Sequence, residues 1–202
     1  MVYDYIIENF KQGEPIFFEE LPGKSRDALR HEIKGLVDNK KLERYQKGIY
    51  FIPYTTLFGT PGKVPIRKYI EKRYLKDSTG YITGLQLANT YGFTTQVPSC
   101  YEICSNEATT KQRKQIIDGN TVIIYKPLTE VSSKNASALQ FLDLMTTIDK
   151  YNETSGEEYY SKLKKYVTNA KVNFDVVKKL LPLYPDRTYR NIYEGGLMRE
   201  LV

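Results

Sequence analysis

The sequence predicts an α+β protein, and three patterns along the chain support this fold class. Residues 1–53 combine helical apolar spacing with a glycine-centred hairpin pattern. A second hairpin pattern lies near residue 119, and helical apolar patterns dominate after residue 137. We therefore expect four segments: residues 1–53, a connector over 54–65, a mixed α/β domain over 66–150 and a helical C-terminal extension over 151–202.

The chain begins with an amphipathic helix and a short strand. Val2, Ile6, Ile7 and Phe10 follow helical spacing, and Gln12-Gly13 ends the pattern. The apolar run Ile16-Phe17-Phe18 predicts a short strand at the edge of a small sheet. One helical turn over residues 19–21 then ends at Pro22-Gly23.

A second amphipathic helix is predicted after this turn. Ser25 is a favourable N-cap residue, and Asp38-Asn39-Lys40 ends the pattern. The apolar side of the helix is formed by Leu29, Ile33, Leu36 and Val37. Arg26, Arg30 and Lys34 recur every four residues and lie away from that side.

Two β-rich runs follow this helix and predict a hairpin. They cover residues 42–46 and 49–53, with Lys47-Gly48 at the turn. Helix, strand, helical turn, helix and hairpin follow one another in the order of a winged helix-turn-helix. In that geometry the helix after Pro22-Gly23 enters the major groove of DNA by its N-terminal end.

The charge distribution favours a nucleic-acid partner for this segment. The whole chain carries a net charge of +6, with a pI near 9.1. Residues 1–23 hold one basic and five acidic residues, whereas residues 24–47 hold eight basic and four acidic residues. This polarity is expected of a module that directs one face toward phosphates.

The candidate DNA-contacting residues divide by their chemistry. Arg26 and Arg30 carry planar guanidinium groups that can bind guanine O6 and N7 bidentately. Ser25 can donate a hydrogen bond to a phosphate. Phosphate neutralisation is the expected role of Lys24, Lys34, Arg44 and Lys47. The alternative is that these residues form only the solvated face of an amphipathic helix.

No pattern for catalysis, metal binding or a cofactor is present. Gly23-Lys24-Ser25 lacks the upstream glycine of a phosphate-binding loop, because Phe18 occupies that position. Ile124-Tyr125-Lys126 lacks the acidic residue of a restriction-type nuclease strand. A nucleotidyltransferase would need a Gly-Ser turn, which the sequence lacks. We therefore expect no enzyme activity, no cofactor and no metal.

The expected cellular location follows from the missing membrane-spanning and signal patterns and from the two cysteines. No apolar run reaches the length of a transmembrane helix, and Met1-Val2-Tyr3-Asp4 does not begin a secretory signal. Cys100 and Cys104 lie four residues apart on a predicted strand, which puts their Cα atoms ~13 Å apart, too far for a disulfide. His31 is distant in sequence, so zinc binding by these three residues is not expected. These features favour a cytoplasmic protein with reduced thiols and no membrane partner.

A helix over residues 64–76 follows the connector. The basic residues in and directly before this helix form a second basic cluster: Lys63, Arg67, Lys68, Lys72, Arg73 and Lys76. A solvated helix face is the favoured interpretation, and extra contact with DNA or an acidic partner is the alternative.

The rest of the chain alternates helical and strand patterns. Thr83 is expected to cap a helix over residues 84–91, and residues 101–104 form a candidate strand. Asp118-Gly119-Asn120 is a strong hairpin signal. The predicted C-terminal helices begin at residue 138 and continue over residues 159–169, 174–181 and, more weakly, 188–201.

In the order of its motifs, the sequence resembles the AbiEi-like antitoxins of type IV toxin–antitoxin systems, which act in abortive infection. The resemblance covers roughly residues 1–150. It is carried by Lys47-Gly48-Ile49-Tyr50-Phe51-Ile52-Pro53, Phe58-Gly59, Pro61, Gly84, Ala88, Gly92-Phe93-Thr94-Thr95-Gln96-Val97-Pro98 and Tyr125-Lys126-Pro127.

This resemblance implies a repressor that binds an inverted repeat in the promoter of its own operon. It also implies a second domain that counteracts a nucleotidyltransferase-like toxin without forming a stable complex with it. The alternative function is a protein-interaction module that uses the winged helix as a docking surface and does not bind DNA.

Overall fold

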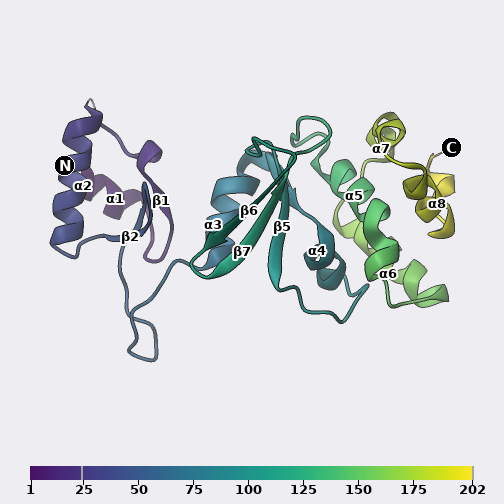
Figure 1. The fold of residues 1–202 in the computed structure, drawn as a ribbon, viewed down its shortest axis with the longest axis horizontal. Coiled ribbons are helices and arrows are strands. Elements are labelled where there is room, and N and C mark those ends of the chain that lie inside the picture. The colour runs from purple at the N-terminus through teal and green to yellow at the C-terminus, as the bar shows by residue number, and fades with distance from the viewer. Residues whose placement is uncertain (24, 202) are drawn as a thin grey trace. The chain divides into compact units, whose positions relative to one another are not determined.

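Helices alternate with two small sheets along the chain, which confirms the predicted α+β class. The computed structural model describes residues 1–23 and 25–201. The chain divides into an N-terminal unit, Met1–Arg73, and a C-terminal unit, Tyr74–Val202. Figure 1 shows the elements of both, and each unit is described by itself.

The N-terminal unit holds two main helices and three short strands. They are α1 (Val2–Asn9), β1 (Ile16–Phe17), a 3-10 turn (Phe18–Glu20), α2 (Arg26–Asp38), β2 (Glu43–Gln46) and β3 (Ile49–Phe51). A further helix, α3 (Ile66–Ile70), continues as a π-helical segment over Glu71–Leu75. The helix predicted over residues 64–76 is therefore present, but its hydrogen-bonding pattern changes half-way along it.

The three strands form an antiparallel sheet in the order β1-β3-β2. Tyr50 in the central strand pairs with Ile16 on one side and with Arg44 on the other. The register between β2 and β3 is irregular between Arg44 and Gln46. Gly48 joins β2 to β3 with a φ of 76°, a conformation that glycine adopts without strain.

One apolar cluster holds the two helices and the sheet of this unit together. Its buried members are Ile6, Ile16, Leu21, Leu29, Ile33 and Leu42. The partly buried side chains of Leu36 and Val37 pack against it. The aliphatic side of the second helix is therefore directed inward, as the sequence predicts.

The connector after β3 forms a closed loop, which its composition did not predict. Thr55 pairs with Pro61 across it, and the backbone of Thr56 bonds both Gly59 and Thr60. A side chain at Gly62 would collide with the ring of Tyr54. Figure 1 shows this loop extending from the unit between β3 and α3.

The C-terminal unit begins with a mixed sheet and ends in helices. Its main elements are β4 (Gly80–Ile82), α4 (Gly84–Thr90), β5 (Cys100–Ser105), β6 (Gln112–Ile117), β7 (Asn120–Tyr125), α5 (Ala136–Tyr151), α6 (Gly156–Asn169), α7 (Phe174–Leu180) and α8 (Asp186–Glu194). Short 3-10 turns cover Lys76–Ser78, Leu181–Leu183 and Met198–Leu201.

The sheet of this unit has the strand order β4-β5-β7-β6. β5 and β7 are parallel, and the other neighbouring pairs are antiparallel. Asp118 and Gly119 both have positive φ in the turn between β6 and β7, which is the geometry of a tight two-residue hairpin. The predicted hairpin is confirmed.

The long helix α5 is the centre of the C-terminal unit. Leu139, Phe141, Leu142 and Met145 are all fully buried on it. The helix packs on β4 and also contacts α4, α7 and α8. Figure 1 shows α6, α7 and α8 gathered around α5 on the side away from β6. Among the described helices, none combines the length and apolar character needed to cross a membrane.

Candidate nucleic-acid interface

The helix α2 presents its basic side chains to solvent because its opposite side is anchored. Ser25 is the N-cap, and its hydroxyl oxygen accepts a hydrogen bond from the Ala28 amide at 3.4 Å. Leu29 and Ile33 are at most 2% exposed. This anchoring fixes the rotation of the helix about its axis, so residues on the other side face water.

The three residues of the predicted basic row are exposed. Arg26, Arg30 and Lys34 lie on successive turns of α2. The guanidinium Nη1 of Arg30 donates to Asp27 Oδ1 at 2.6 Å. The side chains of this ion pair are 67% and 84% exposed, respectively. This short-range pairing orients Arg30 without burying its charge.

Phe18 contacts residues of both α2 and the β2–β3 hairpin. The guanidinium carbons of Arg26 and Arg30 lie 5.5 and 5.9 Å from the centre of its ring. The Phe18 carbonyl accepts from Arg26 Nη1 at 3.4 Å. Its amide donates to the carbonyl of Gly48 at 2.9 Å. The N-terminal half of α2 and the hairpin turn are thus tied to a single residue.

The hairpin adds two further exposed cations. Arg44 lies on β2, and its Nε donates to the carbonyl of Gln46 at 3.3 Å. Lys47 is exposed in the turn next to Gly48. The structure therefore brings Arg26 and Arg30 to the ring of Phe18, whose backbone also bonds Gly48 in the hairpin turn, next in sequence to the exposed Lys47.

The remaining residues named from the sequence are Lys24, Ser25 and His31. Lys24 lies outside the described residues. Ser25 is exposed, and because its oxygen acts as an acceptor in the cap, its hydroxyl proton is still able to bond a phosphate. His31 is exposed beside the basic row, as expected.

Lys72 of the second basic cluster is not a surface cation. Its ammonium group lies 2.9 Å from Glu20 Oε2 and 3.4 Å from Glu14 Oε1. It also donates to the carbonyl of Pro15 at 2.8 Å and lies 4.5 Å from the centre of the Phe10 ring. Its side chain is 16% exposed. Lys72 therefore joins the α3 region to the first strand and its flanks, whereas Arg67 and Lys68 are exposed on α3.

In the C-terminal unit, the motif Thr94-Thr95-Gln96 surrounds one carboxylate. Glu153 accepts hydrogen bonds from the Thr95 amide and from the side chains of all three motif residues, at 2.7 to 3.0 Å. The Thr95 amide and these side chains lower the pKa of Glu153 to about 2. Asn89 donates to the carbonyls of Thr94 and Gln96. These bonds hold the loop that follows α4 against the end of α5.

A second carboxylate, Glu102, holds the start of α4. Its Oε2 accepts from the Leu85 amide at 3.0 Å, and its Oε1 accepts from the Tyr125 hydroxyl at 3.0 Å. Gly84 has a φ of 63°, and a side chain there would collide with the Glu102 carboxylate. The glycine of the motif is therefore required by this close approach.

A third carboxylate is enclosed within the unit. Tyr81 donates to Asp143 Oδ2 at 2.8 Å. Burial raises the pKa of Asp143 to about 6, although the hydrogen bond from the Tyr81 hydroxyl favours its charged form. Burial and the nearby Asp143 charge raise the pKa of the Cys104 thiol to about 12. Cys100 and Cys104 are both free thiols, as predicted, and Cys104 is buried.

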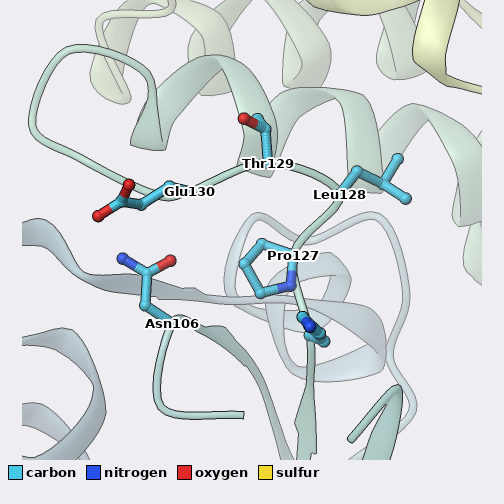
Figure 2. A pocket seen from close by; sticks show the side chains of 6 residues that line it. Asn106, Pro127, Leu128, Thr129 and Glu130 are labelled. Carbon is cyan, nitrogen blue, oxygen red and sulfur yellow. The ribbon is translucent and has the colours of Figure 1, made fainter. Parts of the chain in front are cut away.

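A surface hollow of ≈ 370 Å³ lies beside the segment that follows β7 (Figure 2). It is lined by Asn106 and residues 126–130. Asn106 bonds the amide and the carbonyl of Val131, each at 2.8 Å, so both ends of its amide are used to hold the chain. Lys126 and Glu130 contribute opposite charges. Among residues 1–23 and 25–201, no group of three or more His, Cys, Asp or Glu side chains is arranged to hold a metal ion.

Neither a protein-family model nor a curated protein matches this chain. Among solved structures, it is similar to the crystal structure of the RV2827C protein from Mycobacterium tuberculosis. The identity is 13% and the TM-score is 0.45, over 98% of this chain and 78% of the other.

Proposed function

We propose that the N-terminal unit is a winged helix that binds double-stranded DNA and that the protein is a transcriptional regulator. The order of α1, β1, the 3-10 turn, α2 and the β2–β3 hairpin supports this proposal. The observation that carries it is that Phe18 contacts the exposed Arg26 and Arg30 of α2 and also bonds Gly48 in the hairpin turn, beside the exposed Lys47. Helix and hairpin can then reach one duplex from the same part of the unit.

In this proposal α2 is the recognition helix and the hairpin is the wing. Arg26 and Arg30 read guanines in the major groove, because their planar forks match O6 and N7. Lys34, Arg44 and Lys47 contact phosphates and fix the register of the protein on the duplex. Ser25, the N-cap of α2, adds a phosphate contact, and Lys24 is assigned another on the basis of its charge.

We extend the proposal to the biological role implied by the ordered motifs. The chain would repress its own operon at an inverted repeat and act as the cytoplasmic antitoxin against a nucleotidyltransferase-like toxin. Two of these motifs contact carboxylates of the C-terminal unit. Gly84 leaves room for the Glu102 carboxylate, and Thr94-Thr95-Gln96 donates hydrogen bonds to Glu153. The motifs therefore shape that unit, whichever surface counteracts the toxin.

The DNA proposal is tested by measuring the affinity of the full chain for its own upstream DNA. Arg26→Ala combined with Arg30→Ala should weaken binding by about 2 to 6 kcal/mol, at least roughly 30-fold, because each lost guanine contact costs about 1 to 3 kcal/mol. Arg67→Ala combined with Lys68→Ala removes the same charge from α3 and is the matched control.

The control pair should retain most of the affinity and all of the sequence preference. If both pairs weaken binding equally, α2 does not read bases. A wild-type chain that binds no duplex would favour the protein-docking function.

The antitoxin role has its own test in growth assays. Co-expression of this chain should restore the growth of cells that express a nucleotidyltransferase-like protein encoded beside its gene. Rescue should persist in the Arg26, Arg30 double variant, because repression and antitoxicity are assigned to different units. No rescue by the wild-type chain would contradict this role and leave the DNA proposal standing.

A further inference from the structure

We infer that Phe18 is the positioning residue whose ring sets the direction of both guanine-reading arginines. This inference rests on the DNA-binding function proposed above. Phe18 carries no charge and lies before the recognition helix, so the chemistry of base reading does not point to it. Its contacts do.

The aromatic ring and the backbone of Phe18 act on three different groups. The ring makes cation–π contacts with the guanidinium groups of Arg26 and Arg30. The carbonyl accepts from Arg26 Nη1, and the amide donates to Gly48. The backbone bonds survive a change of side chain, so a substitution of Phe18 removes only the contact of its ring with Arg26 and Arg30.

Long exposed arginines normally sample many rotamers and lose that freedom when they bind a base. A ring next to both guanidinium groups restricts these side chains before DNA binds. Arg30 is held by two contacts, because its Nη1 donates a hydrogen bond to Asp27 Oδ1 at 2.6 Å and its guanidinium group lies near the Phe18 ring. Such preorganisation favours the selected sequence, whereas phosphate contacts by Lys34 or Lys47 do not depend on it.

Phe18 also begins the 3-10 turn, so packing alone could explain an apolar residue there. Leucine would satisfy that requirement, because the side chain is only half-buried. Leucine offers no π-face, and a tyrosine does. The comparison of leucine with tyrosine therefore separates a structural role from a positioning role.

The experiment uses the full chain and two duplexes. One is selected by the wild-type chain from a random-sequence pool, and the other is its scrambled counterpart. Phe18→Leu should weaken binding to the selected duplex by about three- to tenfold, with little change on the scrambled duplex and an unchanged salt slope. Phe18→Tyr should restore the preference. Phe58→Leu, at a ring that is 91% exposed in the connector, is the matched control and should behave as wild type.

Thermal unfolding of each variant shows whether the fold is intact. The inference is overturned if Phe18→Leu keeps the full preference, or if it loses affinity for both duplexes equally. It is also overturned if tyrosine fails to restore the preference. A wild-type chain that selects no sequence contradicts the proposed function itself, which distinguishes that failure from the failure of Phe18.

Discussion

The two units use their charged side chains in different ways. In the N-terminal unit, Arg26, Arg30 and Lys34 stand on the exposed side of a helix whose other side is buried. In the C-terminal unit, Glu102 and Glu153 accept hydrogen bonds from the backbone and side chains of neighbouring segments. The cations of α2 are directed outward, whereas these two carboxylates hold neighbouring segments of their unit together.

This difference shows which charges are informative about a partner. A charge that already satisfies several internal donors is expensive to redirect, because the donors would lose their partners. A charged side chain that is exposed, and that contacts only other exposed groups, can still bind a ligand. Lys72 belongs to the first kind of charge although it lies in the N-terminal unit, since it is held by Glu14, Glu20 and Pro15.

The largest internal effect is expected from Asp143, the enclosed carboxylate of the C-terminal unit. Its pKa is about 6 in the folded protein, against an ordinary value of 3.8. The folded chain therefore binds more protons than the unfolded chain between about pH 4 and 6, and the free energy of unfolding falls as the pH rises through this window. Asp143→Asn should stabilise the protein by up to about 3 kcal/mol at pH 8 and have little effect at pH 4.

Urea unfolding of the wild type and the variant at several pH values measures this difference. Asp149→Asn, at an exposed position on the same helix, is the control and should show no such pH-dependent gain. A variant that is equally destabilised at pH 4 and pH 8 would mean that the carboxylate is held charged by Tyr81.

A smaller loss of stability is expected when the Lys72 contacts are removed. Lys72→Met keeps most of the aliphatic stem but leaves Glu14 and Glu20 close together without their cation. The free energy of unfolding should fall by about 2 kcal/mol, between the values typical of surface and buried ion pairs. Lys68→Met on the same helix should change it by less than about 0.5 kcal/mol. Equal effects in chemical denaturation would show that Lys72 is an ordinary surface residue.

The smallest effect is expected at the turn of the β2–β3 hairpin. Lys47→Ala should weaken binding to all duplexes similarly and reduce the slope of binding against salt by about one unit, because one phosphate contact is lost. Fluorescence anisotropy at several salt concentrations measures this slope. Lys11→Ala, which removes an exposed charge after α1, should leave the slope unchanged. A loss of sequence preference in the Lys47 variant would assign this lysine to base reading instead.

Local chemistry predicted many individual elements. The Ser25 cap, the buried Leu29 and Ile33, and the Asp118-Gly119 turn are present because each depends on a few neighbouring residues. The change from α to π hydrogen bonding after Ile70 was not predictable, since no residue type there signals it. The closed connector loop depends on pairing between Thr55 and Pro61, which composition does not reveal.

The exposure of the basic row was predictable, but the contacts around it were not. Helical periodicity places Arg26 and Arg30 on one side, as the structure shows. It says nothing about Phe18, which is brought to them by the fold of a preceding segment. Lys72 was grouped with exposed cations for the same reason, because its partners Glu14 and Glu20 are more than fifty residues away in sequence.

The most direct test is the salt dependence of duplex binding by the full wild-type chain. Four cations, Lys24, Lys34, Arg44 and Lys47, are assigned to phosphates, so the logarithm of the binding constant should fall with the logarithm of salt concentration with a slope of about −3 to −4. Binding that is absent, or that does not change with salt concentration, would contradict the assignment of these cations to DNA phosphates.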